Sequence, residues 1–139
     1  MEPVKFSYVV DGENFVSAGE ASVAVKTALK QLGFSPDVIR RVSIAMYEAE
    51  INMVIHARGG TADVEITPEQ IRVVMTDEGP GIADVSLAMA EGYSTAPDDV
   101  RSLGFGAGMG LPNIKKYSDD LEIKTKLGVG TTLIITFNC

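Results

Sequence analysis

Hydrophobic and polar residues recur along most of the chain with the periods of strands and helices. Residues 4–10 are rich in aromatic and β-branched residues and end at the turn pair Asp11-Gly12, which predicts a strand. From residue 16 to residue 32, apolar residues recur near the helical period and stop before Gly33, which predicts an amphipathic helix. The positions expected on its buried face are Val16, Val23, Ala24, Ala28 and Leu32.

A second helix is predicted from Pro36 to about Ala57. Ser35 has the side chain of a helix N-cap, and proline follows it at the first helical position. The Gly59-Gly60 pair is expected to end this helix. The positions expected on one face are Val38, Val42, Ala45, Ala49, Asn52 and Ile55.

The remaining pattern predicts a β-hairpin, a weakly patterned middle region and a helix followed by two closing strands. In order, these elements are strands 62–67 and 70–76 with a turn at Pro68-Glu69, a helical piece 85–90, a polar loop 94–102, a helix 111–117, and strands 121–126 and 131–137. Helices on one face of a mixed, mostly antiparallel sheet would form a two-layer α/β sandwich of the α+β kind. No repeat or linker divides the chain, so residues 1–139 are expected to form a single domain.

Composition narrows the classes of function. The chain has 139 residues, 45% of them hydrophobic, and a net charge of −7, which disfavours nucleic acid as a partner. No secretory signal pattern follows Met1 and no apolar run approaches the roughly 20 residues that span a bilayer, so we expect a cytoplasmic protein without membrane contact. The single cysteine, Cys139, fits a reducing compartment. An acidic protein can still bind a polyanion through backbone N–H groups and a divalent cation.

Three polar residues share one row of the second predicted helix. Glu48, Asn52 and His56 are spaced four residues apart, so their side chains project from the same face. A carboxylate and an amide placed this way on an apolar helix suggest a binding site. The same spacing also fits a solvent-facing row, and His56 also fits a polar group at a helix end.

Two glycine-containing segments follow predicted strands. Asp77 begins the run Asp77–Gly81 at the mouth of a half-buried strand, where its carboxylate could accept a hydrogen bond from an amino group while the glycines allow close approach to a flat ring. An ordinary turn is the alternative. The segment Gly128–Thr132 fits a hairpin turn that places Thr131 at the start of the last strand.

The run Gly104–Gly110 contains four alternate glycines and leads into a helix. Such a backbone loses much conformational freedom on ordering, which favours a functional loop that directs N–H groups toward phosphates. A flexible linker is the alternative. The run fits neither the P-loop nor the dinucleotide-binding fingerprint. Lys115 and Lys116 follow it by about one turn. Either could approach the phosphates, but a solvated helix face is the expectation.

Taken in this order, the segments resemble the Bergerat (GHKL) ATP-binding fold of gyrase, Hsp90, histidine kinases and MutL. Glu48–Asn52 with His56 resembles the N box, Asp77–Gly81 and Gly104–Gly110 the first two glycine boxes, and Gly128–Thr131 the closing box. The short chain and the segments 91–95 and 110–115 are similar to anti-sigma factors and switch-type serine kinases of the RsbW and RsbT kind. Residues 97–102 make the expected lid longer and more acidic than in the shortest members.

The resemblance implies roles for individual residues. Asn52 would coordinate Mg²⁺ at the ATP phosphates, and Glu48 would be the base toward the attacking hydroxyl. Asp77 would receive the adenine amino group, helped through water by Thr131. The residues implied in cofactor binding are Asn52, His56, Asp77, Gly79, Gly81, Ile82, Gly104, Phe105, Gly106, Ala107, Gly108, Met109, Gly110, Leu111 and Thr131.

The resemblance also implies an activity and partners. We expect Mg-ATP-dependent phosphorylation of a serine or threonine on a small antagonist protein of the STAS type, which regulates a sigma factor or another regulator. The alternative is a nucleotide-gated binding module that acts without essential phosphotransfer. A homodimer is compatible with either role.

Overall fold

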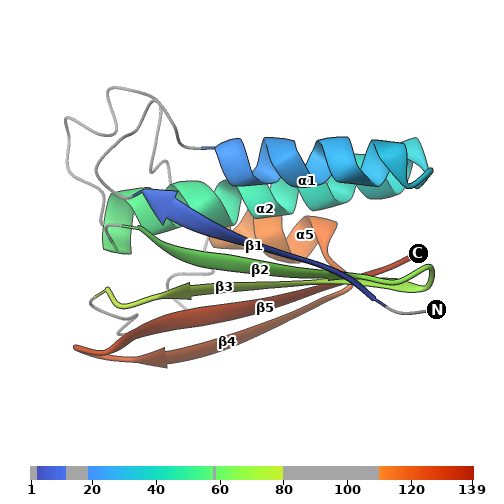
Figure 1. Ribbon diagram of the computed structural model, residues 1–139. Coiled ribbons are helices and arrows are strands. Elements are labelled where there is room, and N and C mark those ends of the chain that lie inside the picture. The colour runs from blue at the N-terminus through green and yellow to red at the C-terminus, as the bar shows by residue number, and fades with distance from the viewer. Residues whose placement is uncertain (1–2, 12–18, 58, 80–109) are drawn as a thin grey trace, which may run out of the picture.

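A computed structural model describes residues 3–11, 19–57, 59–79 and 110–139, and the structural statements below concern these residues. Its strands are β1 (Val4–Asp11), β2 (Gly59–Ile66), β3 (Gln70–Asp77), β4 (Asp120–Lys126) and β5 (Gly130–Asn138). They form one sheet in the order β1-β2-β3-β5-β4, and each neighbouring pair is antiparallel. Helices α1 (Glu20–Gln31), α2 (Pro36–Ala57) and α5 (Gly110–Tyr117) cover one face of this sheet (Figure 1). The predicted two-layer α+β sandwich is therefore confirmed.

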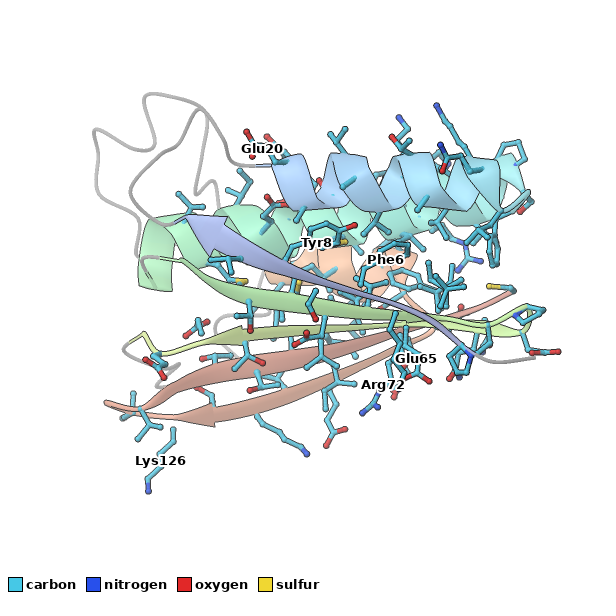
Figure 2. All side chains as sticks on the ribbon, viewed as in Figure 1. Phe6, Tyr8, Glu20, Glu65, Arg72 and Lys126 are labelled. Atoms are coloured by element: carbon cyan, nitrogen blue, oxygen red, sulfur yellow. The ribbon has the colours of Figure 1, made fainter. Side chains whose placement is uncertain are left out.

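The core lies between α2 and the inner face of the sheet. Strand residues alternate between the two faces, so the inward positions of β3 and β5 are buried and the outward ones are more exposed. Glu65 and Arg72, paired in the β2–β3 register, point away from the helices (Figure 2). The largest fully buried side chains are Phe137, Leu29, Met46, Ile66, Ile71, Met75, Ile114 and Ile135.

Helix α2 follows the prediction closely at both ends. Ser35 caps it, because its Oγ accepts a hydrogen bond from the Val38 N–H at 3.3 Å. The predicted face is buried at Val38, Val42, Ala45 and Ala49, whereas Asn52 is half-buried. The side chain of Ile55 lies outside the described residues.

Helix α1 differs from the prediction in its start and in its buried face. Gly19 has φ 99°, a left-handed conformation that no helix continues through, so α1 begins at Glu20 and not at residue 16. Val23 and Leu32, expected to be buried, are 61% and 45% exposed. Val25 and Leu29, which are four positions apart, lie on the buried face of the helix instead. The buried positions of α1 are Ala21, Ser22, Val25 and Leu29. Val16 lies outside the described residues.

The β2–β3 hairpin turns where predicted, with the Thr67 N–H donating to the Gln70 carbonyl at 2.9 Å. Strand β2, however, begins at Gly59, three residues before the predicted start. The glycine pair thus follows the end of α2 and also opens the strand. Gly60 must be glycine because a Cβ there would lie 2.1 Å from the carbonyl oxygen of Thr76. The predicted helical piece 85–90 and polar loop 94–102 lie outside the described residues.

A buried carboxylate joins the start of α1 to α2. Glu50 in α2 is 2% exposed, and its carboxylate accepts the backbone N–H groups of Gly19, Ala21 and Ser22 at 2.8, 3.2 and 3.0 Å. These N–H groups have no partner within the helix, and they form the positive end of its dipole. Glu50 therefore caps α1 from a neighbouring helix.

We expect Glu50→Gln to lower the free energy of unfolding by about 2–3 kcal/mol, because hydrogen bonds to charged groups contribute roughly 1.5–3 kcal/mol each. The glutamine amide keeps one acceptor and turns an NH₂ group toward donors. Urea denaturation measures the effect. Glu20→Gln, which removes an exposed carboxylate from the first turn of α1, is the matched control. Equal midpoints for the two variants would contradict the capping role.

Candidate functional site

The inner face of the sheet changes from apolar to polar at one end. In the register of β3, β5 and β4, Asp77 is opposite Thr131 and Thr131 is opposite Thr125. Two residues away on each strand, the same face carries Met75, Leu133 and Ile123, which pack in the apolar core. This end of the sheet lies on the same side of the molecule as the last turns of α2 (Figure 1). A polar row beside an apolar layer is typical of small-molecule sites.

Asp77 holds the local backbone with one of its two carboxylate oxygens. Oδ1 accepts the Gly79 N–H at 2.9 Å and the Thr131 N–H at 3.2 Å. Among the described residues, no hydrogen bond to Oδ2 is found, so this oxygen remains an acceptor for a ligand. Gly130 permits the close approach of β5, since a Cβ there would lie 2.1 Å from the Asp77 carbonyl oxygen.

Thr131 and Thr125 form a hydroxyl pair next to Asp77. Their Oγ1 atoms are 2.9 Å apart, and the Thr125 hydroxyl also donates to the Gly130 carbonyl at 3.3 Å. Thr131 is buried and Thr125 half-buried. The sequence reasoning identified Thr131 but missed Thr125. The position of Thr125 opposite Thr131 across the predicted hairpin was the signal that could have found it.

An open hollow of about 640 Å³ adjoins this polar row. Asp77, Glu78, Thr125 and Thr131 are among its lining residues, together with the turn between β4 and β5. Its size falls within the roughly 300–1,000 Å³ that small-molecule pockets occupy. Thr76, Thr132 and Lys124, which are opposite one another in the strand register on the outer face of the sheet, line the hollow as well, so it opens at the end of the strands.

On the helical side, Glu48 is half-buried in α2 and faces α5. Burial raises the pKa of its carboxyl above the ordinary value, because the charged form loses solvation, and a hydrogen bond from the Asn113 side chain opposes this effect. A raised pKa in a carboxylate at a candidate site is a feature of acid–base residues. Asn113 was not predicted, although it lies only three residues after Gly110.

The structure places Asn52 on α2, one turn beyond Glu48, and half-buried. His56 is in the last turn of the same helix, but its side chain lies outside the described residues. Gly110 begins α5, and Leu111 is buried in the core. Lys115 and Lys116 are exposed, which agrees with the expected solvated face. The predicted site residues that lie outside the described residues are Gly81, Ile82, Gly104, Phe105, Gly106, Ala107, Gly108 and Met109.

The predicted residues thus fall into two groups. Asp77, Gly79 and Thr131 are joined by hydrogen bonds at the end of the sheet, while Glu48 and Asn52 lie on α2. Within the described part of the chain, no group of three or more histidine, cysteine or acidic residues could hold a metal ion. The amide oxygen of Asn52 suits Mg²⁺, a hard cation that often takes only one or two protein ligands beside phosphates and water.

No helix in the described ranges is both long and apolar enough to cross a membrane.

Comparisons with known proteins give matches over most of the chain. A family model described as a histidine kinase-like ATPase domain matches residues 16–137. An anti-sigma F factor of Clostridium beijerinckii is 34% identical over 131 residues, which cover 87% of this chain and 88% of that protein. The serine/threonine-protein kinase RsbT of Bacillus subtilis is 28% identical over 112 residues, 78% of each chain.

Solved structures show the same fold at lower sequence identity. A Mycobacterium tuberculosis protein with RsbU and RsbW domains superposes with a TM-score of 0.66 and 15% identity, over 96% of this chain and 32% of that one. The mycobacterial sensor histidine kinase MprB gives a TM-score of 0.55 and 16% identity over 97% of both chains.

Proposed function

The chain belongs to the histidine kinase-like ATPase domain family, an ATP-binding family, and from this premise we propose that it is a Mg-ATP-dependent protein serine/threonine kinase. Its relatives are anti-sigma F factors and the kinase RsbT, which supports a role among partner-switching regulators. In the proposal, the substrate is a serine or threonine on a small antagonist protein of the STAS type. The regulated protein would be a sigma factor or another regulator.

The observation that carries the proposal is the arrangement at Asp77. One carboxylate oxygen is held by two backbone N–H groups, and the other is left as an acceptor beside a hollow. An acceptor fixed in this way complements the exocyclic amino group of adenine. Thr131, which is in register with Asp77, supports a second contact through water.

Glu48 is proposed as the base. Phosphoryl transfer depends mainly on positioning and charge neutralisation, with one group to accept the proton of the attacking hydroxyl. The half-buried carboxylate, whose pKa is raised by burial, supports this role, because its basicity is higher than that of an exposed glutamate. When bound, Mg²⁺ would neutralise charge on the phosphates, and Asn52 would hold it by its amide oxygen. The proposed phosphate contacts come from the backbone of the Gly104–Gly110 run.

A nucleotide-gated binding module without essential phosphotransfer is the second candidate. The observation that favours it is exposed apolar surface on the first strand and helix, where Val9 is 86% and Val23 61% exposed. Exposed apolar side chains mark a protein-binding surface where they form one contiguous patch. In this case the nucleotide would control the binding of the partner.

One experiment separates the two candidates. The full chain is used as bait in a pull-down with and without Mg-ATP, and the recovered protein is then tested for radiolabel transfer and mapped for phosphorylated residues. The kinase proposal expects one labelled serine or threonine on the partner. ATP-dependent capture without any label would favour the binding module. The absence of ATP binding would contradict both.

For the metal, we expect Asn52→Ala to remove the dependence of ATP binding on Mg²⁺. The wild-type protein should bind ATP about tenfold or more tightly with Mg²⁺ than with a chelator, since one ligand contact to a metal-bound phosphate contributes on the order of 1.4 kcal/mol or more. Calorimetry with and without Mg²⁺ measures the ratio. Asn52→Asp, which keeps an oxygen ligand, should preserve it. An unchanged ratio in Asn52→Ala would remove Asn52 from the metal site.

A further inference from the structure

We propose that Asn113 is a positioning residue for phosphoryl transfer, which holds the carboxylate of Glu48 in the orientation that it needs as the base. The inference rests on the proposed function and deepens it, because it adds the residue that aligns this base. Asn113 is in the first turn of α5, and Glu48 is in α2. The two residues are far apart in the sequence, so only the packing of one helix on the other brings their side chains together.

The packing of α5 against α2 fixes the place of Asn113. The two helices are in direct contact (Figure 1). Leu111 and Ile114, which are close to Asn113 in α5, are buried in the same core cluster as Ala45 and Ala49 of α2. Asn113 itself is half-buried. Its side chain therefore starts from a backbone that the core holds in place, which is what a positioning residue requires.

The side chain of Asn113 forms a hydrogen bond with the carboxylate of Glu48. An ionised carboxylate can only accept hydrogen bonds, so the donor is the NH₂ group of the asparagine. Among the described residues, no ion pair involves Glu48. The hydrogen bond from Asn113 therefore selects one orientation of a side chain that could otherwise rotate.

A neutral amide suits this task better than a charged group would. A lysine or arginine beside Glu48 would stabilise its charged form and lower its pKa, which would weaken it as a base. An aspartate would repel the carboxylate and supply no donor. Asparagine carries no charge, so it can orient the carboxylate without neutralising it.

Two variants of Asn113 test the role. Asn113→Ala removes the donor, and Asn113→Asp keeps the shape but offers only acceptors. Transfer is measured in single turnovers, with radiolabelled ATP and the partner that the pull-down recovers. We expect both variants to lower the rate by about tenfold to 100-fold, because a displacement of about 1 Å can cost 100-fold in rate. ATP affinity, measured by calorimetry, should stay within about threefold of wild type, since the contact acts on the chemical step.

Two controls separate this role from a structural one. Asn138→Ala truncates an exposed asparagine of β5 and should leave transfer unchanged. If Asn113 acts through Glu48, the double variant of Asn113→Ala with Glu48→Gln should lose no more activity than Glu48→Gln alone. Thermal unfolding without nucleotide checks that each variant is folded, and Asn113→Asp replaces Asn113→Ala if the latter is not.

Carbon NMR of the Glu48 carboxyl group tests the contact without a partner. In Asn113→Ala, the pKa of Glu48 should rise, because the lost hydrogen bond favours the charged form. An unchanged pKa would overturn the inference, and so would transfer at the wild-type rate by the folded variant. Either result would leave the proposed kinase function intact. If the wild-type protein transferred no phosphate to the recovered partner, the proposed kinase function would fail instead, and this inference with it.

Discussion

Replacing Glu48 by glutamine is expected to lower phosphoryl transfer to the partner by about 10²- to 10⁴-fold, the usual contribution of a positioned base. Glutamine keeps the size of the side chain and can still contact Asn113, but it cannot accept a proton. The half-buried site should therefore remain intact, and ATP affinity should stay within about threefold of wild type. Single-turnover transfer with radiolabelled ATP measures the chemical step apart from product release.

The pH dependence gives an independent measurement of the same role. The base acts when ionised, so the rate should rise with pH through the pKa of Glu48. Burial raises this pKa. The acid limb of the pH–rate profile should therefore lie at a higher pH than it would for an exposed glutamate. Glu122→Gln removes an exposed carboxylate from β4 and is the control. Transfer by Glu48→Gln at the wild-type rate, with an unchanged profile, would falsify the assignment.

Replacing Asp77 by asparagine is expected to weaken ATP binding by about 2–4 kcal/mol, or roughly 30- to 700-fold in Kd. Asparagine can keep the Oδ1 acceptor that holds Gly79 and Thr131. Its NH₂ group then takes the place of Oδ2 and turns a donor toward the amino group of adenine. The variant therefore changes the hydrogen-bond direction with little change in shape.

Calorimetry with Mg-ATP measures the loss for Asp77→Asn, and thermal unfolding without nucleotide serves as the control for the fold. Asp77→Ala removes the two backbone hydrogen bonds as well, so it should lower both ATP affinity and stability. The comparison of the two variants separates recognition of the base from support of the backbone. If Asp77→Asn bound ATP within threefold of wild type, the carboxylate would have no part in recognising adenine.

Local sequence signals predicted the elements that depend on them. The Ser35-Pro36 start of α2 and the turn at Pro68-Glu69 are set by residues adjacent in the chain, and both were predicted where the structure has them. The buried face of α1 was not predicted correctly, because Val23 and Val25 fit the helical period about equally well. Packing against α2 and the sheet decides between them and turns Val23 outward.

The sequence indicated those residues of the candidate site that belong to motifs recognised by their order along the chain. The order of segments along the chain indicated Glu48, Asn52, Asp77 and Thr131, and the structure joins the last two by a hydrogen bond. Partners contributed by other elements were missed, because strand register and helix packing bring them together over long separations in the sequence. The resulting contacts are Asn113 with Glu48 and Thr125 with Thr131.

Glu50 shows the same limit within a single helix. It lies two residues after Glu48, so at about 100° per residue it points to nearly the opposite side of α2. The resemblance to the N box covered Glu48–Asn52 as one motif and gave Glu50 no role of its own. The structure shows instead that Glu48 faces α5 and Glu50 caps α1. Only the positions of the neighbouring helices distinguish the two roles.

The strand order has a consequence for how this protein can join with others. Strand β1 is at one border of the sheet, and β2 separates it from the Asp77–Thr131–Thr125 row on β3, β5 and β4. An edge strand can pair with a strand from another chain through its unpaired backbone N–H and C=O groups. Pairing of β1 with a strand of another chain would therefore leave the Asp77–Thr131–Thr125 row unchanged. A mutation in β1 that alters this pairing need not alter ligand recognition at the row.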